Sequence, residues 1–198
     1  MNKKWLPWAI VGGVVLLIVV MLVGTYNSLV TDREKVVTAF SNVQTQYQRR
    51  ADLIPNLVST VKGASNFEQD TLTQIVDARA KATSITIDAS KATSADMQKF
   101  MDAQNGVTSS LSRLIAVAEA YPTLTATATY QDLMNQLEGT ENRIQVARTD
   151  FNAVARPYNT RVQTFPTNLI AGMFGFTSRP YFEASAGSET VPTVNFGN

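Results

Sequence analysis

Residues 133–165 read LMNQLEGTENRIQVARTDFNAVARPYNTRVQTF, and apolar side chains recur along this stretch in steps of three and four. Spacing this close to a heptad is typical of helices that cross at about 20°, as in antiparallel bundles and coiled coils. We therefore expect a long helix in an all-α protein, interrupted at Pro157 and ended by Pro166. The predicted seam consists of Leu133, Leu137, Thr140, Ile144, Ala147, Phe151, Val154, Tyr158, Val162 and Phe165.

Two other long stretches carry helical spacing. The first leads from the N-terminal apolar segment to Gly63, with a kink or restart expected at Pro55, which has no N–H to donate. The other begins at a cap, Ser94 or Asp96, and stops at Pro122. Their seams are Leu29, Val36, Phe40, Val43, Tyr47, Ile54, Leu57 and Val61, and then Met97, Phe100, Gln104, Val107, Leu111, Leu114, Ala118 and Tyr121.

A shorter helix is expected from Phe67 to about Ala82, folding against the first as a hairpin and leaving residues 83–94 as a loop. The expected fold is all-α, with one N-terminal transmembrane helix followed by an antiparallel bundle of about four long helices. We divide the chain into an anchor (1–25), the bundle (26–167), an apolar segment that packs on the bundle or the membrane (168–183) and a disordered tail (184–198).

Every residue from Leu6 to Val23 is apolar or Gly. At 1.5 Å per residue this run spans about 27 Å, close to the thickness of the hydrocarbon core of a bilayer. Trp5 and Trp8 are expected at the lipid headgroups. Ala9 and Gly13 form a small-xxx-small pair that can bring two spans together, although small residues are common in spans. The competing interpretation is a cleaved signal peptide, but the run is long for one and no small-x-small cleavage pattern follows it.

The charges that flank the apolar run predict its orientation. Lys3 and Lys4 precede it together with the terminal amine, and Arg33 and Lys35 follow it. Positive charge is in excess on the cytoplasmic side of membrane proteins. We therefore expect a single-pass protein of the inner (plasma) membrane, with its bundle on the periplasmic or outer side.

The chain contains no Cys and no His. Their absence excludes Ser-His and Cys-His nucleophiles, an ordinary zinc site, disulfides and a His-ligated haem. A ferritin-like di-iron site is disfavoured as well, because such sites take Glu-x-x-His motifs from two helices. Lys and Arg number 17 against 16 Asp and Glu, which gives no electrostatic reason to expect a nucleic-acid partner. We expect no cofactor.

Two blocks of sequence carry a family resemblance. Residues 49–58 read RRADLIPNLV and are followed by VKG at 61–63, while residues 137–144 read LEGTENRI and are followed by AR at 147–148. Later blocks are YN at 158–159, FPTN at 165–168, FGF at 174–176 and YF at 181–182. From the span to Phe182 the chain resembles the LemA family. The resemblance implies a membrane-anchored bacterial protein with a helical bundle, and it implies no reaction.

The same two blocks contain the polar residues that attract most attention. They are Arg49, Arg50, Asp52, Asn56, Glu138, Glu141, Asn142 and Arg143. We expect them to pair across neighbouring helices and so to fix the register of an otherwise apolar bundle. The alternative is an exposed face on which another membrane protein docks. Burial of the side chains distinguishes the two.

These observations favour a non-enzymatic scaffold or adaptor that is held in the lipid bilayer and forms a homo-oligomer through its spanning helix, its juxtamembrane helix or both. Two alternatives stay open. One is a hydrolase or lyase that acts on cell-envelope material, which would need a deep cleft with two converging carboxylates. The other is a module that senses lipids or peptides through residues 169–176.

Overall fold

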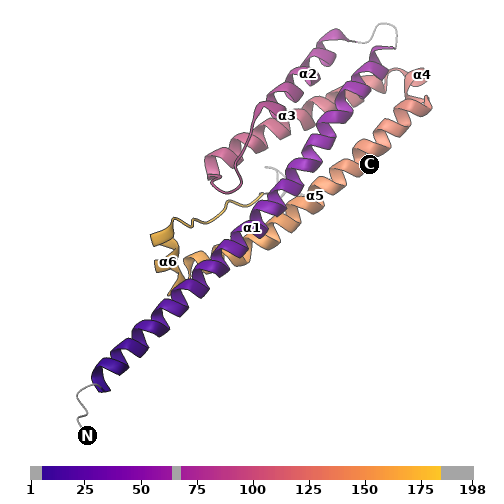
Figure 1. Ribbon diagram of the computed structural model, residues 1–198. Helices are drawn as coiled ribbons and strands as arrows, with labels where there is room; N and C mark the ends of the chain where they lie inside the picture. Colours follow the sequence, from indigo (N-terminus) through magenta and orange to yellow (C-terminus); the bar gives the residue numbers. More distant parts are fainter. Residues whose placement is uncertain (1–5, 64–67, 184–198) are drawn as a thin grey trace, which may run out of the picture.

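A computed structural model describes residues 6–63 and 68–183, and within these ranges every regular element is a helix (Figure 1). The expected all-α fold with a long N-terminal apolar helix is therefore confirmed. The predictions for Trp5, Phe67 and the tail 184–198 lie outside the described residues. The helices are α1 (Leu6–Lys62), α2 (Gln69–Ser84), α3 (Ser94–Ala118), α4 (Pro122–Thr125), α5 (Ala128–Gln163) and α6 (Thr167–Phe174).

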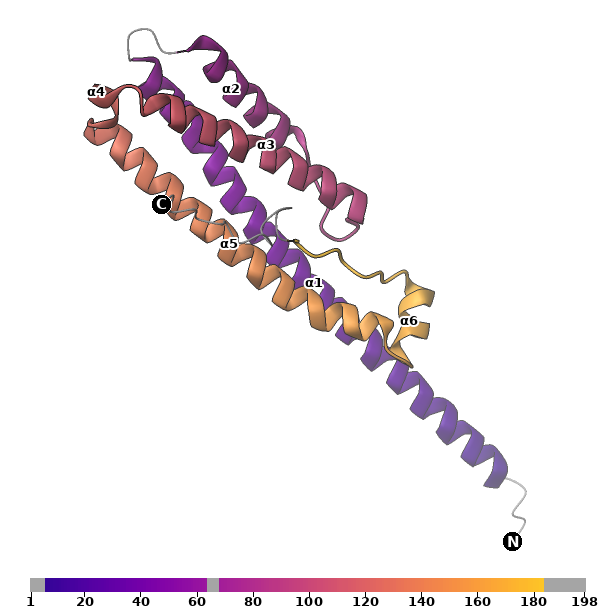
Figure 2. The same ribbon diagram turned by 180° about the vertical axis from the view of Figure 1, so that it is seen from behind.

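Helices α1 and α5 form the long axis of the molecule and run antiparallel side by side (Figures 1 and 2). The α2–α3 hairpin lies along one side of this pair, and α6 packs against α1 near the C-terminal end of α5. The N-terminal part of α1 projects beyond the other helices. It is exposed throughout and has a mean hydropathy of 2.6 over 18 residues, which makes it long and apolar enough to cross a membrane.

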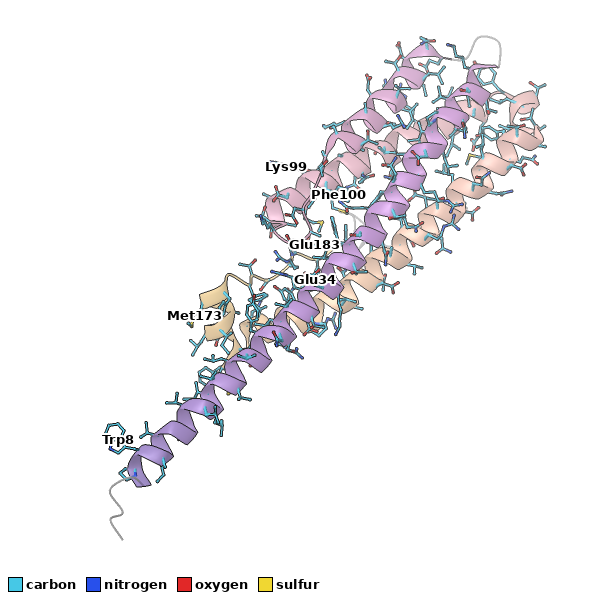
Figure 3. All side chains as sticks on the ribbon, in the orientation of Figure 1. Trp8, Glu34, Lys99, Phe100, Met173 and Glu183 are labelled. Carbon is cyan, nitrogen blue, oxygen red and sulfur yellow. The ribbon has the colours of Figure 1, made fainter. Side chains whose placement is uncertain are left out.

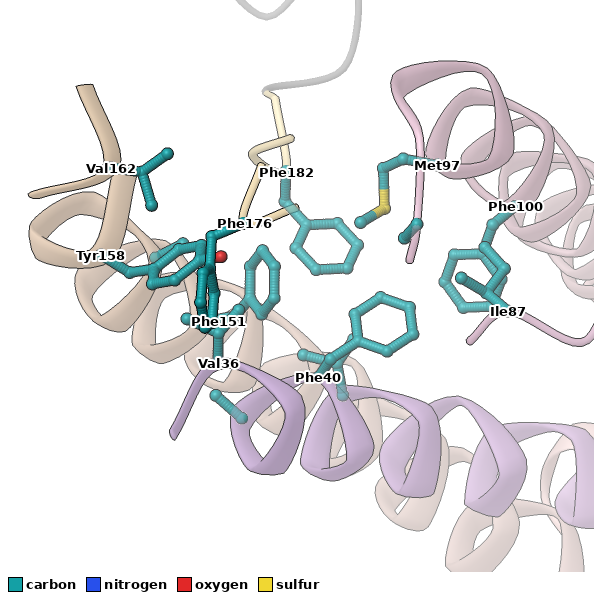
Figure 4. Packing of buried hydrophobic residues seen from close by; sticks show 14 of the residues in the cluster. Val36, Phe40, Ile87, Met97, Phe100, Phe151, Tyr158, Val162, Phe176 and Phe182 are labelled. Carbon is teal, nitrogen blue, oxygen red and sulfur yellow. The ribbon is translucent and has the colours of Figure 1, made fainter. Parts of the chain in front are cut away.

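The bundle is held by two apolar clusters that follow one another along its axis. The cluster nearer the projecting end of α1 is rich in aromatic rings (Figure 4). There the ring of Phe40 lies 5.7 Å from that of Phe151 and 6.1 Å from that of Phe182. Complete burial of one large apolar side chain contributes about 1.5–3 kcal/mol, so these rings account for much of the attachment of residue 182 to the bundle.

Two prolines lie inside helices, and the expected restart at Pro55 and interruption at Pro157 are wrong. Helix α1 continues through Pro55 and α5 continues through Pro157. Both prolines are exposed, so neither ring is forced into the core. At Pro55 the missing bond is replaced, because the carbonyl of Ala51 accepts a hydrogen bond of 2.7 Å from the Nε of Arg79 on α2.

The N-terminus of α3 differs from the expectation by one residue. The cap is Thr93, and neither Ser94 nor Asp96 takes that position. The Thr93 hydroxyl accepts from the Asp96 amide at 3.2 Å, and the Asp96 carboxylate accepts from the Thr93 amide at 3.1 Å, which is a capping box. Hydrogen bonds from the Thr93 hydroxyl and amide hold the pKa of the Asp96 carboxyl below its usual value.

Two further boundaries also differ. Helix α3 ends at Ala118, and Pro122 is the first residue of the short helix α4. This position suits a residue without an N–H. Helix α5 ends at Gln163, before Pro166. Phe165 therefore falls outside the helix and is exposed, although it was expected in the seam.

Candidate functional site

Arg50 on α1 is the most deeply buried charged residue of the described chain, with 2% of its surface exposed. One of its terminal nitrogens donates to the side-chain oxygen of Gln104 at 2.6 Å and to the Gln104 carbonyl at 3.1 Å. The other donates to Glu141 at 2.9 Å and to the Thr108 hydroxyl at 3.0 Å. A single side chain thus connects α1 to α3 and to α5.

These contacts form a polar layer, consisting of Arg50, Gln104, Thr108 and Glu141, between the two apolar clusters. A buried cation is tolerated only when an anion and several acceptors surround it. Here the Glu141 side chain is 37% exposed, so water screens the ion pair and weakens its contribution. The hydrogen bonds to the Gln104 side chain and carbonyl lie deeper and carry more of the stabilisation.

A cavity of about 190 Å³ opens beside the polar layer. Arg50 and Gln104 line it together with Tyr47 and the amide side chains of Gln44 and Gln48. None of its lining residues is a carboxylate or a lysine. The cavity therefore lacks the acid–base pair that hydrolysis by carboxylates requires. The side-chain nitrogens of Gln44 and Gln48 already donate to the Ile87 carbonyl and to Asp52.

Tyr47 forms one wall of this cavity. The guanidinium carbon of Arg50 lies 5.0 Å from the centroid of its ring, a distance typical of a cation–π contact. Burial raises the pKa of the Tyr47 hydroxyl above 10.0, although Arg148 and Arg50 act in the opposite direction. The phenol is therefore neutral at physiological pH and serves as a hydrogen-bonding group.

Of the eight polar residues expected to pair, the structure brings Arg50 and Glu141 together in an ion pair between helices. Asp52 accepts from Gln48 at 2.8 Å, and Arg143 donates to Thr140 at 3.3 Å, both within one helix. Within the described ranges, the other six make no hydrogen bond or ion pair to a neighbouring helix through their side chains. These six, all exposed, are Arg49, Asp52, Asn56, Glu138, Asn142 and Arg143.

Sequence reasoning missed three partners at this site. Gln104 was expected in the seam of α3 but was not recognised as a partner of Arg50. A polar residue among the apolar residues of a seam indicates a buried hydrogen-bonding group. Thr108 follows one turn later, and its hydroxyl also donates to the Gln104 carbonyl at 3.1 Å. Arg79 gave no sequence signal, since only the fold brings it to the carbonyl that Pro55 leaves without a partner.

A second set of polar contacts attaches the C-terminal segment to α5. The side-chain nitrogen of Asn159 donates to the backbone carbonyl of Arg179 at 2.8 Å, and the side-chain oxygen of Asn159 accepts from the backbone N–H of Arg179 at 2.7 Å. Asn152, two helical turns earlier, makes the same pair of bonds to Phe182 at 2.8 and 2.9 Å. The Arg179 guanidinium donates in turn to the Ser90 carbonyl, in the loop before α3. The segment after α6 is therefore an ordered part of the bundle up to residue 183.

Other hollows on the surface are open. The groove between α1 and α5 measures about 640 Å³ and is lined by Glu34, Lys35 and Asp150 beside uncharged residues. Both of its carboxylates belong to exposed residues. A hydrolase that works with two carboxylates needs them in a deep cleft, and this groove does not provide one. In the parts of the chain that the structure describes, no three acidic side chains are grouped so as to hold a metal ion.

The predicted membrane-anchor residues Trp8, Ala9 and Gly13 all lie on the exposed part of α1. A Cβ atom added at Gly13 would meet no heavy atom within 4 Å. The small-xxx-small pair is therefore not used for packing within the described chain.

Comparison with known proteins places these features within a family. The model of the LemA family matches residues 39–196, a range that includes the polar layer and α6. Magnetosome protein MamQ 2 of Paramagnetospirillum magneticum is 28% identical over 186 positions, which cover 83% of this chain and 67% of the relative. Protein LemA of Metamycoplasma hominis is 27% identical over 163 positions, which cover 82% of this chain and 71% of the relative. Neither name states a reaction.

Proposed function

This chain belongs to the LemA family, and on that premise we propose that it is a non-enzymatic scaffold or adaptor, anchored in a membrane by α1. The observation that carries the proposal is the continuity of α1 from Leu6 to Lys62. At 1.5 Å per residue its 57 residues form a rod of about 86 Å. The same rod is fully exposed and apolar in its first part and lines both apolar clusters in its second.

A continuous helix couples the bundle rigidly to the span. Leu29, six residues beyond the end of the apolar run at Val23, is already fully buried in the first cluster. Any tilt or rotation of the span is therefore transmitted to the bundle without a flexible linker between them. Rigid coupling of this kind suits a protein that holds a partner at a fixed distance from the membrane.

The interior polar groups also support a structural role. Both terminal nitrogens of Arg50 donate hydrogen bonds to Gln104, Thr108 and Glu141, all of which belong to the bundle itself. Catalytic groups usually lie in a cleft open to substrate, whereas the Arg50 side chain is almost completely buried. We therefore propose that the protein is not an enzyme.

We place the protein in the inner (plasma) membrane, with the bundle on the periplasmic or outer side. The proposal rests on the charges before the span, Lys3 and Lys4, and on the positive-inside tendency. The exposed polar residues of the two family blocks, such as Arg49, Asn56 and Asn142, would then face a partner outside the cytoplasm. That partner is a second copy of the chain or another membrane protein.

Self-association can be tested by measuring the particle mass of the full-length protein in native-like membrane discs. We expect a uniform assembly larger than one chain. If the spanning helices make the contact, Gly13→Leu should reduce the mass, because the new side chain meets nothing within its own chain and can only obstruct a neighbouring helix.

Gly12→Leu is the matched control, since Gly12 is equally free of contacts but lies about 100° around the helix. An assembly that survives both substitutions would assign the contact to the juxtamembrane part of α1. A strictly monomeric protein at all concentrations would refute self-association and leave an adaptor for another membrane protein.

A further inference from the structure

Helix α6 is apolar on its outer face as well as on its inner one. Ile170 and Ala171 are buried against the bundle, whereas Leu169, Met173 and Phe174 are 60%, 76% and 56% exposed. Phe165, just before the helix, is exposed as well. Contiguous exposed apolar side chains of this size mark contacts with a membrane or with another protein.

The segment around α6 carries no charge. Every residue from 162 to 178 is neutral, and Arg161 and Arg179 flank the segment. A neutral, apolar segment suits the boundary between acyl chains and headgroups. The two flanking arginines are held by contacts within the protein, because Arg161 forms an ion pair with Asp32 at 2.6 Å and Arg179 is buried.

Aromatic contacts fix the position of α6 along α1. The ring of Tyr26 lies 4.9 Å from that of Phe174 and 5.7 Å from that of Phe176. Tyr26 follows the last residue of the apolar run, Val23, by about 4.5 Å along the helix. Helix α6 therefore lies at the level where α1 leaves the hydrocarbon core, and Figure 3 shows Met173 at this junction, with Trp8 at the far end of the projecting part of α1.

The distance between the aromatic residues matches a bilayer. Trp8 and Tyr26 are about 27 Å apart along α1 at 1.5 Å per residue, close to the hydrocarbon thickness of about 30 Å. Trp and Tyr are enriched at both membrane–water interfaces. Trp8 thus marks one interface, and Tyr26 together with α6 marks the other.

We propose that α6 is a second membrane contact, whose exposed side chains Phe165, Leu169, Met173 and Phe174 insert between the lipids of the leaflet next to the bundle. The inference rests on the proposed function, because it requires α1 to span the bilayer. Its contact with Tyr26 makes the α6 surface continuous with the exposed apolar surface of α1, which is why lipid, and not a second copy, is the occupant. Two contacts on one rigid body would also fix the tilt of the bundle.

The test uses single-tryptophan reporters in the full-length protein, reconstituted in vesicles of phosphatidylcholine brominated at the upper part of the acyl chain. Met173→Trp is introduced after Trp5→Phe and Trp8→Phe, so that the reporter at position 173 is the only tryptophan. The matched control is Val146→Trp in the same background. Val146 is also exposed and apolar, but it lies on α5 roughly 30 Å farther from the span at 1.5 Å per residue.

A third chain, with Trp5→Phe alone, keeps Trp8 and reports on the span. We expect bromine to quench most of the emission of Trp8 and of the reporter at 173, and little of the emission at 146. Quenching of Trp8 without quenching at 173 would overturn the inference and leave the proposed function intact. A reporter at 173 that is shielded both from bromine and from aqueous iodide would show that a second copy covers α6, which also overturns it. If Trp8 itself is not quenched, α1 does not span the bilayer, and the proposed function fails first.

Discussion

At the scale of single residues, the two neighbouring arginines of the first family block have opposite environments. Arg50 is buried in the polar layer, and Arg49 is exposed. An α-helix turns by about 100° per residue, so the two side chains point in different directions, and here one faces the core and the other faces solvent. The long Arg50 side chain also fills a position in the seam of α1, between Tyr47 and Ile54.

This contrast yields a matched pair of substitutions. Arg50→Met should destabilise the bundle by about 2–3 kcal/mol, because it leaves the buried side-chain oxygen of Gln104 without its Arg50 donor and Glu141 without its cation. Arg49→Met should change stability by no more than about 0.5 kcal/mol, as is usual for an exposed site. The measurement is thermal or urea unfolding of the full-length protein in detergent, followed by circular dichroism. Equal stabilities of the two variants would show that the polar layer contributes nothing.

The family blocks alone did not reveal which of their polar residues would be buried. Eight candidates were expected to pair, and one ion pair between helices, Arg50 with Glu141, formed within the described chain. Helical phase places Arg50 between seam positions, so its burial could have been deduced from the spacing. The partners Gln104 and Thr108 depend on how α3 packs against α1, which the pattern of one helix does not specify.

At the scale of secondary structure elements, Pro55 shows why local rules misjudged α1. A proline in a helix normally removes one hydrogen bond and costs about 3 kcal/mol. In this fold the carbonyl of Ala51 finds another donor, Arg79, on the neighbouring helix α2. The proline and the arginine are therefore expected to act as a unit that ties α2 to α1.

A double-mutant cycle tests this coupling. Arg79→Met should cost about 1–2 kcal/mol in the native background, where the Ala51 carbonyl would lose the hydrogen bond from Arg79. In the Pro55→Ala background, the new amide at position 55 can bond that carbonyl, and the cost should fall to about 0.5 kcal/mol or less. Unfolding of the four full-length proteins in detergent gives the interaction energy directly. Strict additivity would mean that Arg79 and Pro55 act independently.

The long elements themselves were predictable, and the reason is their periodicity. The seam of α3 from Met97 to Ala118 is buried as expected, because apolar spacing over many turns outweighs uncertain ends. The ends depend on single side chains. The cap of α3 is Thr93 and not an expected residue, because the Thr93 hydroxyl and amide form a reciprocal pair of hydrogen bonds with Asp96 three residues later. Helix α6 is held in place partly by its contact with Tyr26.

At the scale of the whole molecule, both proposals depend on how α1, one continuous helix, is oriented across the membrane. A rod of about 86 Å that is apolar at one end and embedded in the bundle at the other permits one crossing of the bilayer. If the apolar end crosses the bilayer, as we propose, the two ends of α1 lie on opposite sides of the membrane. The charges around the span further predict that the bundle is the end outside the cytoplasm.

Because the chain has no Cys, single cysteines can report this topology without removing native ones. Asn2→Cys marks the end before the span, and Ser109→Cys marks an exposed position on α3. In sealed right-side-out membrane vesicles, a membrane-impermeant maleimide should label position 109 at once and position 2 only after detergent is added. The reverse pattern would place the bundle in the cytoplasm while keeping the anchor. Immediate labelling at both positions, in vesicles shown to be sealed, would mean that α1 does not cross the bilayer, and the membrane-anchored scaffold would have to be abandoned.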